Sequence, residues 1–182
     1  MNDKYKHVCI HEMSHLVVFL YLGGSPDDIR EMQVKPNNGY LIAFSHSIAL
    51  NYFTHACLAL AGAISDSLIS GEIEYQGDID EAKGRMRQGL IQRGVSQQDL
   101  ERTFDFEYQI AWDFTRSILV EQTQTILQLA AEADGLVNTQ KKISRTKIQK
   151  LSWNLLGVWR KKVVHYYPRS SDVSIDLLAS FA

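Results

Sequence analysis

Apolar residues dominate two segments of the chain, and each of these segments ends at a glycine. The first runs from about Lys4 to Leu22, is apolar almost all round after residue 15, and stops at Gly23-Gly24-Ser25-Pro26. The second runs from Ala49 to Ser70, is rich in Ala and Leu, and closes at Gly71. Helices that are apolar on all sides are buried in globular proteins. Both segments are therefore predicted to be buried helices.

Between these helices, residues that favour strands surround a strong turn signal. Pro36-Asn37-Asn38-Gly39 combines residues that are typical of turns. The pattern predicts a small hairpin with strands near Glu31–Lys35 and Tyr40–Phe44. The second strand could present an edge to an extended peptide. An ordinary hairpin that covers the core is equally compatible with the pattern.

The rest of the chain is predicted to be mostly helical. We expect a loop over Glu72–Gly77, a helix from Asp78 to about Gln92, a long helix from a Ser96/Asp99 capping box to Asp134-Gly135, and a last helix from Ser144 to about Val164, closed by Pro168. The predicted fold class is mainly α, as a single helical domain with a small β-hairpin.

Composition narrows the class of protein. The chain has 182 residues, of which 45% are hydrophobic, and its 19 basic and 21 acidic residues leave a net charge of −2. No overall field therefore attracts nucleic acid. The two cysteines, Cys9 and Cys57, exclude a disulfide scaffold or a cysteine-rich zinc ribbon. The apolar run Leu16–Leu22 is too short for a membrane span. We expect a soluble cytoplasmic protein with no transmembrane segment and no nucleic-acid partner.

Basic residues and tryptophans alternate toward the C-terminus. The run comprises Lys141, Lys142, Arg145, Lys147, Lys150, Arg160, Lys161 and Lys162, with Trp153 and Trp159 among them. Such a stretch could contact an acidic partner or a membrane surface. We favour the simpler interpretation, a solvated helix face whose tryptophans are packed inward.

The candidate chemistry lies in the first predicted helix, where His11-Glu12-Met13-Ser14-His15 forms an HExxH sequence. Residues four apart on a helix are offset by about 40°, so His11 and His15 can reach one metal ion. Zinc binds neutral imidazole well, and a catalytic zinc keeps one position open for water. Glu12 is rotated away from the ligand face and is expected to be the general base for that water. The alternative is a pair of hydrogen-bonded core histidines with Glu12 at the surface.

Spacing alone leaves the third metal ligand open. The pattern HExxHxxGxxH is absent, because Val18 and Tyr21 occupy its defining positions. The acidic candidates are Asp66, Glu72, Glu74, Asp78 and Asp80. Asp78 is also compatible with a helix N-cap. Asp66 lies in an apolar helix, where a carboxylate either orients a ligand histidine or bonds to a neighbouring backbone or hydroxyl group. His7, one turn before His11, is expected at the surface.

Several segments resemble one family in the same order along the chain. VCIHEMSHLVV resembles the VAYHEAGHALV signature of the peptidase domain of FtsH, a zinc protease linked to an AAA ATPase. The segment IREMQVKPNNGYLIAF is similar to the strand and proline-containing turn that follow this signature in the family. The next segment, LALAGAISDSLISGE, resembles the family's LLGGRAAEELVFGE. After it, GDIDEAKGRM resembles the family's NDLERAT element. ILVEQTQTILQLA and RTKIQKL resemble the family's closing helices. The resemblance implies an FtsH protease-domain-like fold over residues 1–151, followed by a helix end and tail over 152–182.

The resemblance also implies a set of site residues. The aspartate of the NDLERAT element is the family's third zinc ligand, and it corresponds to Asp78. Zinc would then be bound by His11, His15 and Asp78, with Glu12 as the catalytic base. Asp66 corresponds to the first glutamate of the family's AAEE segment.

The chain departs from the family in ways that affect the expected activity. Met13 and Ser14 replace the Ala and Gly of HEAGH, and Ala63 and Ser67 replace an Arg and a Glu. Ten residues precede His11 and no GxxxxGK[ST] loop occurs, so the family's ATPase and membrane anchor are missing from this chain. We expect an ATP-independent zinc metalloendopeptidase that acts on extended or unfolded polypeptides. A homo-oligomer and a separate ATPase stay open as partners.

Two other functions also stay open. One is a catalytically silent, protease-like domain that binds a peptide or protein around a structural zinc. The missing ATPase favours it, and the intact Glu12 opposes it, because a structural site needs no base. The other is a zinc hydrolase that acts on a small amide.

Overall fold

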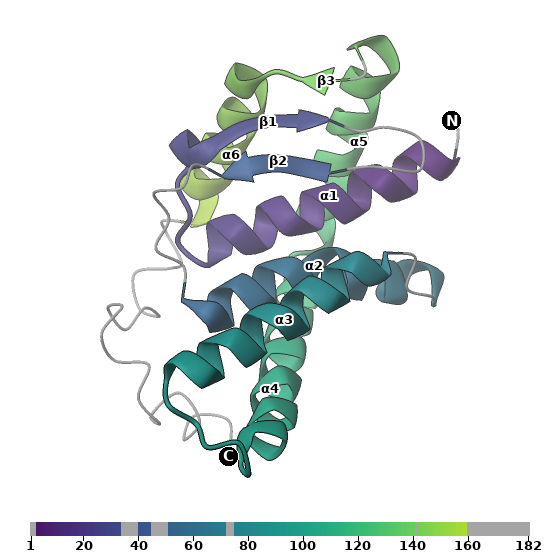
Figure 1. Ribbon diagram of the computed structural model, residues 1–182. Helices are drawn as coiled ribbons and strands as arrows, with labels where there is room; N and C mark the ends of the chain where they lie inside the picture. The colour runs from purple at the N-terminus through teal and green to yellow at the C-terminus, as the bar shows by residue number, and fades with distance from the viewer. Residues whose placement is uncertain (1–2, 34–39, 45–50, 72–74, 141, 160–182) are drawn as a thin grey trace.

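The computed structural model describes residues 3–33, 40–44, 51–71, 75–140 and 142–159, and it is mainly helical (Figure 1). The elements, in chain order, are α1 (Asp3–Tyr21), the short 3-10 helix η1 (Pro26–Asp28), β1 (Ile29–Gln33), β2 (Tyr40–Phe44), α2 (Tyr52–Ser70), α3 (Gln76–Gln92), α4 (Leu100–Glu121), α5 (Thr123–Gln140), β3 (Lys142–Ile143) and α6 (Arg145–Trp159).

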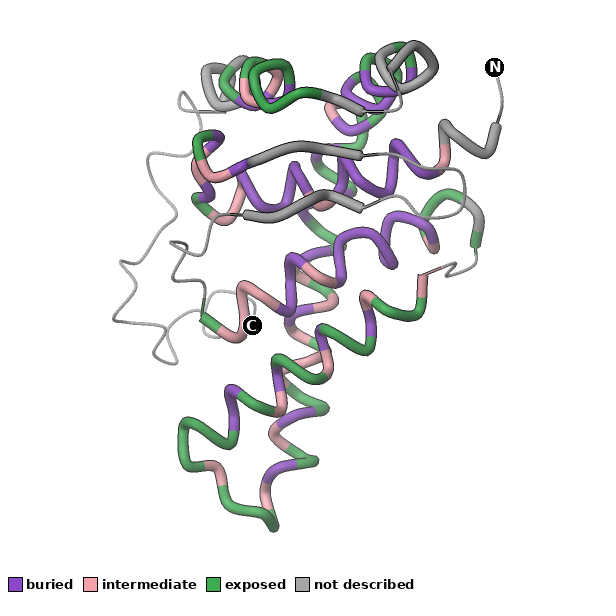
Figure 2. Tube along the Cα trace, turned by 45° about the horizontal axis from the view of Figure 1, so that its top comes forward, coloured by how far each residue is buried: buried purple, intermediate pink, exposed green. Residues whose placement is uncertain are grey.

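The two apolar segments form α1 and α2, which are buried along most of their described length (Figure 2). Gly71 ends α2 in the left-handed region, with φ of 78°, where a residue with a side chain would be strained. The helix begins at Asn51, whose side chain accepts a hydrogen bond from the backbone N–H of Thr54. The end at Gly71 confirms the prediction, whereas the helix begins three residues after the predicted Ala49.

Three short strands form one antiparallel sheet in the order β2-β1-β3. In the pairing of β1 with β2, Ile29 lies opposite Phe44 and Gln33 lies opposite Tyr40. The predicted turn Pro36–Gly39 lies outside the described residues. The third strand was not predicted, because two residues carry no periodic pattern and β3 exists only through its pairing with β1.

The prediction of one long helix from Ser96 to Gly135 is wrong. The chain forms two helices, α4 and α5, which are separated at Gln122. Helical periodicity continues through this point, and neither Gly nor Pro marks the break. The reason for the break is tertiary, because α4 packs mainly on α2 whereas α5 packs on α1. Ser96 does accept a hydrogen bond from the backbone N–H of Asp99 at the start of α4.

Of the described helices, α2 is the one that is long and apolar enough to cross a membrane by length and composition, over residues 52–69. In the structure, 61% of that window is buried inside the protein. The helix packs against α1, α3 and α4. It is therefore the central core helix of this fold.

The packing of α2 brings three helices together at one place. It contacts α1 on one side and α3 on another, and Figure 1 shows the three helices as successive layers. On the other side of α1 lie the sheet and α6, which packs against β1 and η1. The HExxH residues of α1 thus lie between a helical layer and a sheet layer.

Candidate metal centre

Helix α1 holds the first three site residues on a buried surface. His11 is 3% exposed, Glu12 is 1% exposed and His15 is half-buried. The alternative in which Glu12 lies at the surface is therefore wrong. Since α1 is regular through this region, the spacing of four residues places both imidazoles on the face that packs toward α2.

Helix α3 supplies the fourth residue from its first turn. The helix begins at Gln76 with Tyr75 as the N-cap, so Asp78 is the third helical residue. The prediction that Asp78 is the N-cap of this helix is wrong by three positions. Its side chain is directed instead at the histidines of α1. A carboxylate in the first turn of a helix is also stabilised by the helix dipole.

Three side-chain atoms from α1 and α3 form a nearly equilateral triangle. Asp78 Oδ2 lies 3.1 Å from His11 Nε2 and 3.3 Å from His15 Nε2. The two Nε2 atoms are 3.2 Å apart. This group of His11, His15 and Asp78 is the one set among the described residues in which three possible ligand atoms come this close together.

The size of this triangle fits zinc. Two ligand atoms that lie 2.0–2.1 Å from a tetrahedral zinc ion are about 3.3–3.4 Å apart. The three distances of 3.1–3.3 Å are within about 0.3 Å of that value. Two imidazoles and one carboxylate are also a donor set that catalytic zinc uses, with a fourth position left for water.

The other ring nitrogen of each histidine is held by an acceptor on α2. His11 Nδ1 lies 3.0 Å from Asp66 Oδ2, and His15 Nδ1 donates to the carbonyl oxygen of Leu58 at 2.8 Å. A carbonyl oxygen can only accept, so the proton of His15 is on Nδ1, and the ionised carboxylate sets the same tautomer for His11. Both Nε2 atoms then present lone pairs toward Asp78 Oδ2. Three acceptors that face one point repel each other unless a proton or a cation lies among them.

The side chains of the site shift one another's pKa values. Burial opposes the charged form of His11, but hydrogen bonds to Asp66 and Asp78 outweigh this effect and raise the pKa of His11 to about 10. Burial likewise opposes the charged form of Asp78, yet the adjacent side chains of His11 and His15 hold the pKa of its carboxyl well below the usual range.

Sequence reasoning missed Gly62 of α2. A Cβ atom at this position would lie 2.3 Å from His11 Nε2 and 2.5 Å from His15 Nε2. Only a residue without a side chain lets the backbone of α2 pass this close to both ligands. The one available signal was a glycine inside an otherwise apolar helix, which often marks close approach of another group.

The remaining candidates lie apart from the three ligand atoms. His7 is half-buried rather than at the surface as predicted, because its Nε2 lies 3.5 Å from Asp66 Oδ1. Asp80 is exposed and accepts a hydrogen bond from Gln76. His55 is half-buried on α2, and burial lowers its pKa. Glu72, Glu74 and His46 lie outside the described residues.

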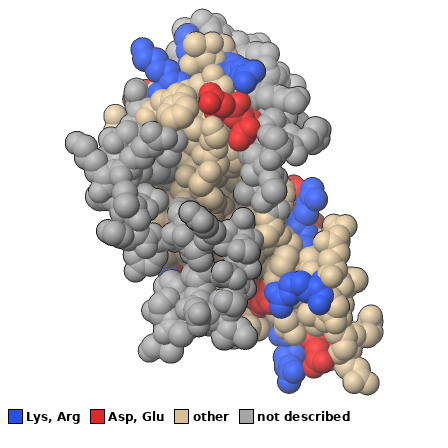
Figure 3. All heavy atoms as spheres, turned by 90° about the vertical axis from the view of Figure 1, so that its left-hand side faces the viewer, with Lys and Arg blue, Asp and Glu red and all other residues tan. Residues whose placement is uncertain are grey.

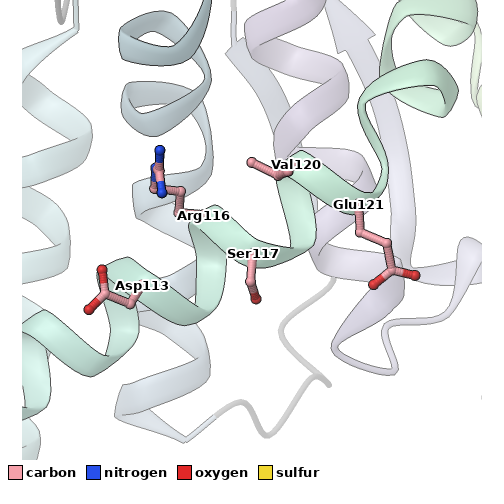
Figure 4. A pocket seen from close by; sticks show the side chains of 5 residues that line it. All are labelled: Asp113, Arg116, Ser117, Val120 and Glu121. Carbon is pink, nitrogen blue, oxygen red and sulfur yellow. The ribbon is translucent and has the colours of Figure 1, made fainter. Parts of the chain in front are cut away.

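A surface hollow on α4 offers no comparable chemistry. It is lined by Asp113, Arg116, Ser117, Val120 and Glu121. Figure 4 shows that all five side chains come from one helix, with Arg116 and Val120 on one side of it and Ser117 on the other. Side chains that diverge in this way do not converge on a ligand. The chemistry of the described residues is therefore concentrated between α1, α2 and α3.

Comparison of the chain with models of protein families and with curated proteins gives no match.

Replacing Asp78 by Ala is expected to remove most of the zinc from the purified protein, because it deletes one of three ligands. Asp80→Ala is the matched control, since it removes an exposed carboxylate two residues further along the same helix. Metal analysis should find about one zinc per chain in the wild type and in the control. Unchanged zinc content in the Asp78 variant would exclude it as a ligand.

Replacing Gly62 by Ala is expected to displace both ligand imidazoles and to lower the free energy of unfolding by about 1–3 kcal/mol. Gly84→Ala adds the same methyl group on α3, where no atom lies within 4 Å. The Gly84 variant should retain zinc, and its free energy of unfolding should rise by no more than about 1 kcal/mol. Thermal unfolding and zinc content measure both effects. Normal zinc binding by the Gly62 variant would contradict the close approach described above.

Proposed function

We propose that this protein is a zinc metallopeptidase that hydrolyses peptide bonds in extended or unfolded polypeptides without ATP. The observation that carries the proposal is the triangle of His11 Nε2, His15 Nε2 and Asp78 Oδ2, with Glu12 next to His11 on the same helix. The resemblance of the HExxH segment and of the segments that follow it to the peptidase domain of FtsH supports the same proposal.

The protein's own residues divide the work in this proposal. His11, His15 and Asp78 hold the metal, while Asp66 and the carbonyl of Leu58 hold the two rings in the required tautomer. Glu12 accepts a proton from the attacking water and later donates it to the nitrogen of the leaving amine. The negative charge of Glu12 is close enough to His11 to contribute to its raised pKa.

Zinc, when bound, would act as a Lewis acid that polarises the scissile carbonyl and lowers the pKa of water. The residues present fit this role because two neutral imidazoles and one carboxylate leave the metal a net positive charge. The roles of Glu12 and of the three ligands are separable, which makes the proposal testable residue by residue.

Strand β2 suggests how a substrate would be held. It pairs with β1 along one edge, and no described strand pairs with its other edge. It also contacts α1, the helix that carries the HExxH residues. An extended peptide could add to this edge through backbone hydrogen bonds, as peptides do in other complexes. This mode of binding requires a substrate that is already extended.

Zinc analysis and product analysis distinguish this proposal from two other functions, a partner-binding domain with a structural zinc and a hydrolase for small amides. If the wild type binds zinc and hydrolyses no peptide, the site is a structural remnant in a domain that binds a partner. If it hydrolyses small amides and not peptides, the substrate class is different. Product analysis with casein, a peptide library and small amides separates the three cases.

Replacing Glu12 by Gln is expected to leave the fold and zinc content unchanged and to reduce peptide hydrolysis by about 10²–10⁴-fold or more. Glutamine keeps the shape of the side chain but cannot accept the proton of water. Glu132→Gln makes the same change at an exposed position of α5 and should have no effect. Full activity of the Glu12 variant would show that the chemistry lies elsewhere or that the activity came from a contaminant.

A stably folded protein is expected to resist cleavage, whereas a destabilised variant of the same protein is cut. The reason is that a folded substrate must open locally before a segment can extend across the site, which costs several kcal/mol. Digestion of both forms with and without ATP measures this difference. Equal rates on the two forms, or a requirement for ATP in purified material, would exclude an unassisted peptidase for extended chains.

A further inference from the structure

Charges are strongly segregated along this nearly neutral chain. Residues 135–171 contain nine of the 19 Lys and Arg residues and none of the 21 Asp and Glu residues. The rest of the chain therefore holds ten basic and 21 acidic residues. The net charge of −2 does not reveal this division. The charge of the surface that α6 forms must therefore be judged from the basic segment itself.

Helix α6 presents one side to the protein and the opposite side to solvent. Ile148 and Ser152 are buried, and they lie four residues apart on the inner side. Lys147, Lys150 and Trp153 are exposed and lie three residues apart, and these three residues form the outer face of α6. On the side of the molecule that Figure 3 shows, lysine and arginine side chains lie at the upper end beside acidic side chains, and others lie at the lower right.

The exposure of Trp153 contradicts the expectation that the tryptophans pack inward. Its side chain is 42% exposed, although it is one of the largest apolar groups in the protein.

The basic surface of α6 ends where acidic residues lie beside the start of the helix. Arg145 donates a hydrogen bond to the backbone carbonyl of Asp27, and η1 places two aspartates beside the start of α6. The outer face therefore begins at Lys147, beyond these aspartates.

We propose that the outer face of α6 binds the surface of a membrane that contains anionic lipids. Lysines on a helix face are attracted to anionic headgroups, and a tryptophan beside them places its ring at the boundary between headgroups and acyl chains.

Trp153 distinguishes a membrane from a duplex nucleic acid as the partner. Both are polyanions and attract lysine, but a duplex provides no apolar layer for an exposed indole ring. The acidic remainder of the chain opposes close approach of either polyanion anywhere else, so the basic segment also determines the orientation of binding. Single-stranded RNA can stack on tryptophan and is therefore one arm of the test.

Binding at the outer face of α6 would not involve the residues of the candidate metal centre. Helix α6 packs on β1 and η1, whereas the ligand atoms lie between α1, α2 and α3. The views in Figures 1 and 2 both place α2 and α3 on the far side of α1 from the sheet. This inference does not depend on the proposed peptidase activity, because it concerns a different surface.

The test is co-sedimentation of the full chain with vesicles of phosphatidylcholine, with and without phosphatidylserine, at low and high salt. The wild type should bind only the vesicles that contain phosphatidylserine, and salt should weaken binding. The double variant Lys147→Glu, Lys150→Glu should bind about 30-fold more weakly or worse. Arg102→Glu, Arg116→Glu is the matched control, since it changes the net charge equally at exposed positions of α4 and should bind like the wild type.

Trp153→Ala tests the apolar part of the proposal without changing charge, and it should also weaken vesicle binding. Three results would overturn the proposal. The first is the absence of phosphatidylserine-dependent binding by the wild type. The second is an equal loss of binding in both double variants. The third is tighter binding to single-stranded RNA or to polyglutamate than to the vesicles, which would assign the outer face of α6 to a nucleic acid or to an acidic protein.

Discussion

The structure is organised around three acceptor atoms that face one point from two helices. His11 Nε2, His15 Nε2 and Asp78 Oδ2 lie 3.1–3.3 Å from one another. Acceptors this close repel each other, so the arrangement is stable only when a proton or a metal ion lies among them. The packing of α1 and α3 on α2, and the hydrogen bonds of the two histidines to α2, place these three atoms.

Helix α2 supplies most of that support, although it contributes no ligand. Leu58 and Asp66 accept hydrogen bonds from the Nδ1 atoms of the two histidines, and Gly62 leaves room for both rings. Asp66 is fully buried, where an unpaired carboxylate would be costly. Its contacts with His11 and His7 offset that cost. An apolar core helix thus also determines the tautomer and the position of the ligands.

Helix α1 separates two surfaces with different charges and different chemistry. On one side, acidic and imidazole groups from α1, α2 and α3 surround the metal centre. On the other side, the sheet carries α6 and its exposed lysines and Trp153. The two surfaces share no residue. The same helix that positions the ligands therefore also keeps the two proposed functions apart.

The sequence alone predicted the two buried helices, the end of α2 at Gly71 and the candidate ligands, because the apolar runs, Gly71 and the HExxH spacing act within a few positions of the chain. It did not determine the break at Gln122, the pairing of β3 or the role of Gly62. Asp78 shows the difference most clearly. As a residue near the start of a helix it was compatible with a cap or a ligand, and only the packing of α1 and α3 against α2 placed its carboxylate beside both histidines. Tertiary packing decided this because a triangle of atoms from residues 11, 15 and 78 depends on distances between helices, which no local pattern encodes.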